Sequence, residues 1–234
     1  MNIVAIVQAR MGSTRFPGKV MLQTNGLTLI QILLERLSES EEITKIVVAT
    51  TFESNDNSLA NHVRSLGYDC EKGSESDVLD RYVTAARAHA ADIVIRITGD
   101  CPLIDAKLVD LCIREFKQKK IDYLSNNHPP SFPDGLDVEV FSRQALEKAA
   151  DEAFEEFDRE HVTPYLRLSG KFLTSSITAD HDYSDMRWTV DEPEDFDVIN
   201  NVVSYFSPNV LFGWSEVLRM EREFPGLFMK NKEI

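Results

Sequence analysis

Apolar runs alternate with amphipathic stretches through the first half of the chain. Three runs rich in β-branched residues are almost wholly apolar, as strands covered on both faces are: 2–7, 45–50 and 92–98. Four stretches carry apolar residues at helical spacing: 28–40, 55–67, 76–90 and 105–118. Asp105 stands at an N-cap position, and Gly67 stands where the second helix should end. This alternation predicts an α/β fold with a mostly parallel sheet and helices on both faces.

The pattern changes after about residue 120. Segments 121–127 and 136–142 are typical of strands, and they flank a proline-rich loop. A helix is expected from about residue 143, followed by a broken helix over 151–170 that is interrupted at Pro164. The remaining expected elements are strands at 171–179 and 186–190, then helices at 192–206 and 214–224. Nothing in the sequence divides the chain, so a single domain over residues 1–234 is predicted.

Composition and charge narrow the classes of function. The chain has 234 residues, a formal net charge of −14 and a sequence pI of about 4.8. Such an acidic surface repels phosphate backbones, so nucleic acid is an unlikely partner. Three dispersed cysteines without a CxxC pair indicate neither a disulfide framework nor a zinc site. No apolar run has the length of a membrane span, so a cytoplasmic protein that needs no membrane is expected.

The segment QARMGSTRFPGK directly follows the first predicted strand. In open α/β sheets, ligands bind beyond the carboxyl ends of the strands. Gly12 allows close approach of the backbone to a phosphate, while Arg10, Arg15 and Lys19 supply positive charge in an otherwise acidic chain. A solvated basic turn is the alternative interpretation of the same residues.

The spacing of this loop excludes the common nucleotide-binding loops. A Walker loop needs four residues between its two glycines and a Ser or Thr after the lysine. Here five residues separate Gly12 from Gly18, and Val20 follows Lys19. The GxGxxG pattern of dinucleotide-binding proteins is absent as well. A P-loop ATPase or kinase is therefore disfavoured.

The loop closely resembles the signature of sugar-nucleotide cytidylyltransferases, above all the spore coat polysaccharide biosynthesis protein F family. This resemblance implies a Rossmann-like three-layer nucleotide-diphospho-sugar transferase fold. It also implies that CTP is bound through six loop residues: Ala9, Arg10, Gly12, Ser13, Arg15 and Lys19. Related guanylyl- and uridylyltransferases have a Gly-Gly pair where this chain has Ala9-Arg10. That difference favours cytosine, and another base such as that of GTP remains the alternative.

Two further segments extend the resemblance. TGDCPLID places Asp100 at the end of the third apolar strand, and RWTVDEPEDFD places Asp191 before a helix. Without the resemblance, Asp100 also fits a turn after the strand, and Asp191 also fits the cap of the following helix. The resemblance makes Asp100 and Asp191 ligands of Mg²⁺, an ion that prefers carboxylate oxygens.

The implied reaction joins a nucleoside monophosphate to a sugar or sugar acid. A sugar hydroxyl attacks the α-phosphorus and pyrophosphate leaves, a step that depends on alignment and electrostatic stabilisation. Lys19 and Arg15 are the candidates for contacting the pyrophosphate, and Arg10 for contacting the α-phosphate. The product would serve a surface or spore coat polysaccharide. A protein that binds nucleotides or sugar phosphates without turnover is the second hypothesis.

A fourth segment, GSESDVLDRY, resembles the family's border of the base and ribose. Asp77 and Arg81 are therefore candidate nucleotide-binding residues, although Asp77 also fits the cap of the following helix. The sequence departs from the family after the second strand, where related enzymes often have Thr-Asp and this chain has Thr50-Thr51.

Residues 121–185 are expected to bind the acceptor and to form a dimer contact. Asp137 and Glu139 alternate with apolar residues and so point to one face of a strand, which is either solvent or the sugar site. The segment REHVTPY resembles the family too, but a single helical histidine such as His161 is more often structural or exposed. By analogy with related enzymes, which pair through this region, a homodimer is expected through hydrophobic residues such as Phe154 and Phe157.

Overall fold

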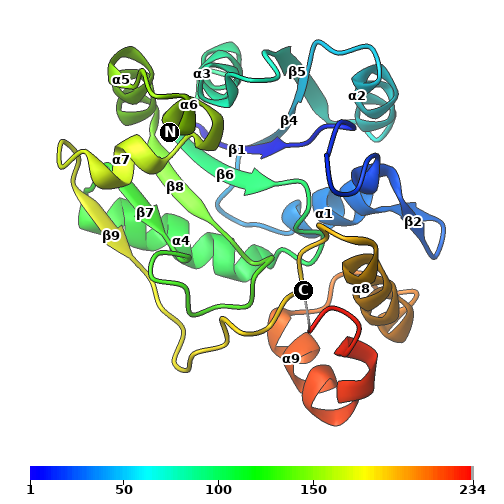
Figure 1. The fold of residues 1–234 in the computed structure, drawn as a ribbon. Helices are drawn as coiled ribbons and strands as arrows, with labels where there is room; N and C mark the ends of the chain where they lie inside the picture. The colour runs from blue at the N-terminus through cyan, green and yellow to red at the C-terminus, as the bar shows by residue number, and fades with distance from the viewer. Residues whose placement is uncertain (233–234) are drawn as a thin grey trace.

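A seven-stranded sheet forms the centre of the computed structural model, which describes residues 1–232 (Figure 1). In spatial order the strands are β5 (Asp69–Gly73), β4 (Lys45–Thr51), β1 (Ile3–Gln8), β6 (Ile93–Thr98), β8 (Glu139–Ser142), β7 (Tyr123–Ser125) and β9 (Thr174–Ser176). Strand β8 runs antiparallel to its neighbours β6 and β7, and all other neighbours are parallel. The sheet is thus mixed and mostly parallel, as predicted.

Helices cover both faces of this sheet and complete three layers (Figure 1). One face carries α1 (Leu29–Leu37), α2 (Asp56–Ser65), α4 (Ala106–Lys119), α8 (Pro193–Phe206) and α9 (Trp214–Glu223). The other carries α3 (Val78–Ala88), α5 (Arg143–Glu152), α6 (Glu156–His161) and α7 (Pro164–Leu168). Short elements complete the chain: β2 (Gln23–Thr24), β3 (Leu27–Thr28) and the 3-10 turns at Lys19–Met21 and Pro225–Phe228.

The apolar strands separate two hydrophobic cores. Side chains along β1 alternate between them, so that Ala5 and Val7 join the core under α1 and α4, while Val4 and Ile6 join the core under α3 and α5. All four are fully buried. Burial on both faces explains why this strand is apolar at almost every position.

Two helix boundaries follow the predicted signals. The Asp105 carboxylate accepts a hydrogen bond from the Leu108 N–H at 3.0 Å and so caps α4. Gly67 follows the last turn of α2 with a φ of +89°, a left-handed conformation that costs glycine little.

The predicted strand at 186–190 is wrong. This segment is extended, but its backbone pairs with two separate parts of the chain and therefore forms no continuous ladder. The Trp188 N–H donates to the Asp134 carbonyl at 2.7 Å, whereas the Val190 N–H donates to the Asp100 carbonyl at 2.8 Å. The broken helix over 151–170 is confirmed at Pro164, which starts α7, and has a second break between α5 and α6.

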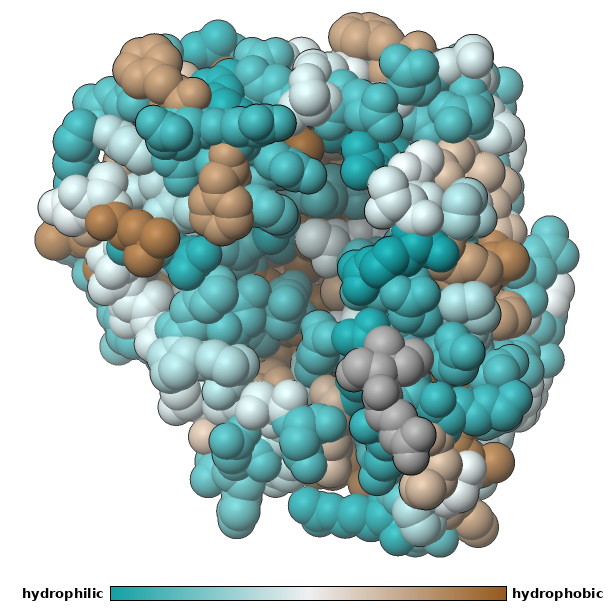
Figure 2. All heavy atoms as spheres, in the orientation of Figure 1, coloured by the Kyte–Doolittle hydropathy of each residue, from teal (hydrophilic) through white to brown (hydrophobic). Residues whose placement is uncertain are grey.

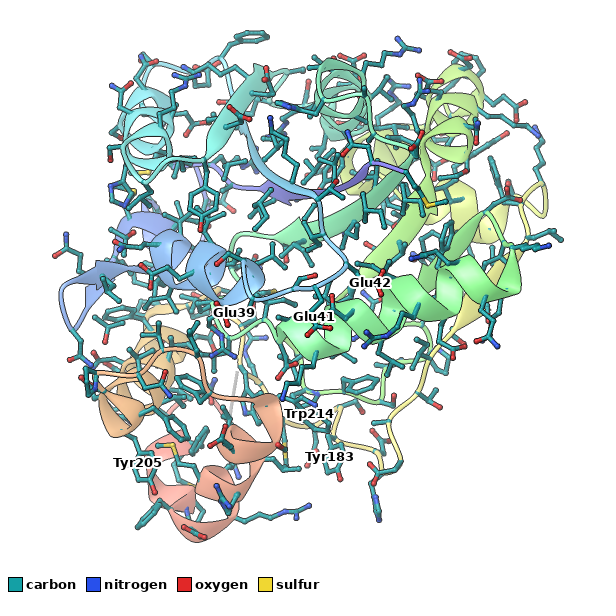
Figure 3. All side chains as sticks on the ribbon, turned by 180° about the vertical axis from the view of Figure 1, so that it is seen from behind. Glu39, Glu41, Glu42, Tyr183, Tyr205 and Trp214 are labelled. Carbon is teal, nitrogen blue, oxygen red and sulfur yellow. The ribbon has the colours of Figure 1, made fainter. Side chains whose placement is uncertain are left out.

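An aromatic contact joins the start of α9 to the loop between β9 and α8. Trp214, at the start of α9, packs edge-on against Tyr183 with ring centroids 5.7 Å apart, and Figure 3 shows the two side by side near the N-terminal end of α4. Glu39, Glu41 and Glu42 lie nearby, after α1, and contribute to the acidic surface (Figure 3).

Exposed hydrophobic side chains gather over the corner formed by α5, α6 and α7 (Figure 2). Phe154 is 86% exposed and Phe157 is 58% exposed, and Leu168 and Leu173 are exposed as well. The homodimer through this surface stays a prediction. Within residues 1–232, no helix combines the length and apolar character needed to cross a membrane.

Candidate active site

The basic loop after β1 is closed by its own backbone. The Gly18 N–H donates to the Met11 carbonyl at 2.9 Å, and Gly18 has a φ of +75°, a conformation that a side chain would strain. This turn directs Lys19 inward, where the residue is only 7% exposed. The loop is therefore a built structure and not a solvated basic turn.

Asp56 holds the other side of the loop. Its carboxylate accepts hydrogen bonds from the backbone N–H of Met11 at 2.6 Å and from that of Thr51 at 3.1 Å, and also from the Thr51 hydroxyl. The residue is 1% exposed and begins α2. The chain lacks the Thr-Asp pair that related enzymes often have after the second strand. The carboxylate near the end of β4 instead belongs to Asp56, five residues after Thr51. Sequence reasoning missed this role.

Lys19 joins the three predicted motifs. Its ammonium lies 3.2 Å from the Asp100 carboxylate and 2.8 Å from the Asp191 carboxylate. Burial alone would lower the pKa of Lys19, but the two carboxylates outweigh it and the pKa lies above its ordinary value. Burial likewise opposes the charge of Asp100, yet Lys19 and a hydrogen bond from Thr98 keep the pKa of Asp100 below its ordinary value. Lys19 and Asp100 are therefore both charged at neutral pH.

Backbone contacts bring the second and third motifs together. The Gly99 N–H donates to the Gln8 carbonyl at 2.8 Å, and a Cβ on Gly99 would stand 2.8 Å from that of Ala9, so only glycine fits there. Hydrogen bonding from Val190 to the carbonyl of Asp100 then attaches the segment that carries Asp191. The two carboxylates face one another because of these contacts.

Asp195 and Arg187 hold Asp191 in place. One Asp195 oxygen accepts the backbone N–H groups of Asp191 and Glu192 at 2.8 and 2.9 Å. The Arg187 guanidinium binds both Asp195 oxygens at 2.8 Å and approaches Asp191 at 3.5 Å. Arg15 contacts Asp191 from the solvent side at 3.0 Å. Sequence reasoning missed this role of Asp195, and the signal that could have found it is its spacing four residues after Asp191.

Asp100 and Asp191 fit the predicted Mg²⁺ site. Mg²⁺ is usually held by one or two carboxylates together with substrate phosphates and water. The two carboxylates already enclose one cationic group, the Lys19 ammonium. Within residues 1–232, no group of three or more His, Cys, Asp or Glu side chains is arranged to hold a metal by itself. The donor set therefore suits a metal that arrives with a nucleotide.

A chamber of about 310 Å³ opens beside these groups. Its walls contain most of the predicted nucleotide-binding residues, namely Ala9, Arg10, Ser13, Arg15, Lys19 and Arg81, with Asp100 and Asp191 at one side. Burial lowers the pKa of Arg81, and the nearby Arg10 adds to this effect. Arg81 donates to the Glu75 carbonyl at 3.3 Å, but its Nε has no hydrogen-bond partner within residues 1–232.

Two predicted nucleotide-binding residues lie outside the walls of this chamber. Gly12 belongs to the loop and faces Glu75, whose carboxylate also pairs with Arg10 at 3.2 Å. Asp77 caps α3 by accepting the Asp80 N–H at 2.9 Å, and the Arg159 guanidinium pairs with its carboxylate. The cap interpretation of Asp77 is confirmed, and its contact with nucleotide stays a prediction.

The two predicted acceptor residues have different surroundings. Glu139 is 2% exposed and accepts hydrogen bonds from the hydroxyls of Tyr123 at 2.5 Å and Thr163 at 2.6 Å, besides an ion pair with Arg96. Solvent is therefore excluded as the environment of Glu139. Asp137 is partly buried without an ion pair among residues 1–232, and burial raises its pKa to about 6.

A second chamber of about 210 Å³ adjoins the first, because Arg96 and His161 line both. His161 is exposed and packs against the Phe157 ring, with centroids 4.6 Å apart. Sequence reasoning did not identify Arg96. The pattern that could have identified it is that Arg96 is a charged residue inside the mostly apolar run 92–98.

Comparison with known proteins shows which family the chain belongs to. A family model described as cytidylyltransferase matches residues 4–219. An uncharacterised protein of Methanocaldococcus jannaschii is 37% identical over 88% of this chain and 85% of its own length. The spore coat polysaccharide biosynthesis protein SpsF of Bacillus subtilis is 33% identical over 85% of each chain. A 3-deoxy-manno-octulosonate cytidylyltransferase of Bdellovibrio bacteriovorus is 31% identical over 73% of this chain and 67% of its own length.

Solved structures show the same relationship. The fold is of the Rossmann-like class, and it is seen with a TM-score of 0.65 in a CMP-2-keto-3-deoxy-manno-octonic acid synthetase that is 19% identical over 88% of this chain and 99% of its own. A cytidylyltransferase of Leptospira borgpetersenii superimposes with a TM-score of 0.94 at 34% identity, covering 100% of this chain and 99% of its own. The chain belongs to the cytidylyltransferase family.

Proposed function

We propose that this protein transfers a cytidylyl group from CTP to a hydroxyl of a sugar acid in the presence of Mg²⁺. The observation that carries the proposal is the Lys19 ammonium held between Asp100 and Asp191 at one side of a chamber lined by arginines. Similarity to a 3-deoxy-manno-octulosonate cytidylyltransferase supports the type of acceptor. Similarity to SpsF supports a role of the product in a surface or spore coat polysaccharide.

In the proposed reaction, the acceptor oxygen forms a bond to the α-phosphorus while the bond from that phosphorus to pyrophosphate breaks. The hydroxyl proton is released, and pyrophosphate leaves with the charge of the broken bond. Lys19, Arg15 and Arg10 all line the chamber, and in this proposal Lys19 and Arg15 would neutralise the leaving group while Arg10 would contact the α-phosphate. Mg²⁺ held by Asp100 and Asp191 would add charge stabilisation at the same phosphates.

The test is pyrophosphate release from CTP, GTP, UTP and ATP with 3-deoxy-manno-octulosonate, sialic acid, glucose 1-phosphate and mannose as acceptors. Release with CTP and a sugar acid is expected. Replacing Asp100 with Asn should lower turnover at least ~100-fold, because the metal-held charge stabilisation is lost. The matched control is Asp180→Asn, which changes an exposed carboxylate outside both chambers.

Three outcomes would contradict parts of the proposal. Binding of triphosphate without any product would indicate a non-catalytic nucleotide-binding protein. Faster pyrophosphate release from GTP than from CTP would show that the transferred nucleotide is guanosine monophosphate and not cytidine monophosphate. A near-normal rate in the Asp100→Asn variant would remove Asp100 from the site.

A further inference from the structure

The segment after α9 returns to the part of the chain that carries Asp191. The side-chain amide of Asn231 donates from Nδ2 to the Asp195 carboxylate and to the Arg187 carbonyl, at 3.0 Å each. Asn231 is only 4% exposed, and it lies after residue 219, where the match to the family model ends. A residue 36 positions after Asp195 therefore contacts both residues that hold Asp191 in place.

The segment 225–232 is fixed by contacts of its own. Figure 1 draws it in red, beside α8. Phe228 is 2% exposed and belongs to the core under α1 and α4. Asn201 on α8 donates from its side-chain amide to the Leu227 carbonyl at 2.9 Å. These contacts hold the backbone before Asn231, so the amide of Asn231 reaches Asp195 from a fixed position.

The two oxygens of the Asp195 carboxylate have different partners. Oδ2 accepts the backbone N–H groups of Asp191 and Glu192, together with one Arg187 nitrogen. Oδ1 accepts the Arg187 Nε at 2.8 Å and the Asn231 amide at 3.0 Å. A carboxylate group is planar and rigid, so a donor that fixes Oδ1 also fixes the direction of Oδ2. Asn231 thus acts on the backbone of Asp191 through Asp195.

Asp195 can serve this purpose because it stays charged. Burial opposes its charge, but Arg187, the two backbone N–H groups and Asn231 keep the pKa of Asp195 below its ordinary value. We infer that Asn231 is a positioning residue of the site, which orients Asp195 and thereby holds the Asp191 carboxylate toward the metal and the triphosphate. This inference rests on the proposed function, in which Asp191 binds Mg²⁺. Outer partners of metal ligands commonly act in this way.

The test compares Asn231→Leu with the wild type in the full-length protein. Leucine nearly keeps the shape of asparagine but donates no hydrogen bond, so Asp195 loses one donor at Oδ1. CTP is titrated calorimetrically at a series of Mg²⁺ concentrations without acceptor. The Mg²⁺ concentration that half-saturates CTP binding should rise about 3- to 10-fold. Loss of a direct partner of a metal ligand costs about 10- to 100-fold, and Asn231 is one contact further away.

Asn201→Leu is the matched control. It removes an amide that anchors the same segment at Leu227 and does not donate to Asp195. Both variants should unfold at a somewhat lower temperature than the wild type, because each loses a hydrogen bond that fixes the segment. Only Asn231→Leu should change the Mg²⁺ dependence of CTP binding.

A second pair of variants separates the hydrogen bond from packing. Glutamine and methionine have similar sizes, and a cavity of about 80 Å³ beside Asn231 leaves room for the longer side chain. Asn231→Gln can still donate to Asp195, so its half-saturating Mg²⁺ concentration should stay within about twofold of the wild type. Asn231→Met has no donor and should resemble Asn231→Leu. This pair decides the question even if Asn231→Leu does not fold.

The outcomes separate this inference from the proposed function. Mg²⁺-dependent CTP binding that weakens in Asn231→Leu, without pyrophosphate release from any acceptor, would support the inference and contradict the transfer reaction. Equal Mg²⁺ dependence in Asn231→Met and Asn231→Gln, or an equal change in Asn201→Leu, would overturn the inference and leave the proposed function standing. If CTP binding to the wild type does not depend on Mg²⁺, neither of them stands.

Discussion

Asp100 and Asp137 lie at the same edge of the sheet, because β8 runs antiparallel to β6 and begins where β6 ends. Burial opposes the charge of both carboxylates, but of the two only Asp100 forms an ion pair within residues 1–232. Lys19 therefore keeps the pKa of Asp100 low, whereas the pKa of Asp137 rises to about 6. Asp100 thus has its counterion built into the structure, whereas Asp137 forms no ion pair within residues 1–232.

The two sides also differ in how the chain builds them. The positive charges of the nucleotide chamber come mainly from one loop, with Arg10, Arg15 and Lys19 within ten residues. The second chamber takes its residues from β6, the loop after β7, β8, α6 and α7.

The largest effect is expected from Lys19→Met. The variant loses the positive charge for the leaving pyrophosphate and leaves Asp100 and Asp191 facing one another without a counterion. Loss of such electrostatic stabilisation should lower kcat/KM about 1,000-fold, as measured by pyrophosphate release. Lys107→Met, which changes an exposed lysine on α4, should keep normal activity. A decrease of less than tenfold in Lys19→Met would show that the loop does not act on the reacting phosphates.

The same contrast between local and scattered residues explains which elements could be predicted from the sequence and which could not. The strands and helices of the first half follow from apolar periodicity, and Asp105 follows from capping chemistry. The segment 186–190 looked like a strand because its composition is that of a strand. Its hydrogen bonds, however, go to Asp134 and Asp100, which are remote in the sequence.

Site residues divide in the same way. Lys19, Asp100 and Asp191 were found because each belongs to a recognisable short motif. The partnership of Arg96 with Glu139 depends on which residues face each other across β6 and β8, and register of this kind is not encoded in a local pattern.

A second prediction concerns the support of Asp191. Asp195→Asn should weaken the bonds to the backbone N–H groups of Asp191 and Glu192 and the paired contact with Arg187. Removing an outer partner of a metal ligand typically costs 10- to 100-fold in metal affinity or activity. We therefore expect a Mg²⁺ requirement about 30-fold higher, with partial recovery of the rate at high Mg²⁺.

Glu194→Gln is the matched control, because this neighbouring acid in the first turn of α8 is exposed. Both variants should be compared by thermal unfolding, since Asp195 is fully buried. A loss of activity that does not respond to added Mg²⁺ would mean that Asp195 supports the fold and not the metal site.

The smallest effect, on Asp137, tests the acceptor side. Its folded-state pKa of about 6 exceeds the unfolded value of about 3.9. The folded state therefore binds the proton more tightly, and this contribution to stability is present below pH 4 and is lost as the pH rises through 6. Asp137→Asn does not ionise, so its free energy of unfolding relative to the wild type should rise by about 1 to 2 kcal/mol between pH 4.5 and 7.5.

Urea unfolding of both proteins at the two pH values measures this difference, with the exposed Asp180→Asn as the control. If the free energy of unfolding changes with pH in the same way for Asp137→Asn and the wild type, then ionising Asp137 does not destabilise the folded state. The contrast with Asp100 would then disappear. If the predicted divergence is abolished by adding a saturating sugar acid, the bound acceptor changes the environment of Asp137, which would place this carboxyl next to the acceptor. Divergence that persists with the acceptor bound would show that Asp137 lies outside the contacts of the acceptor.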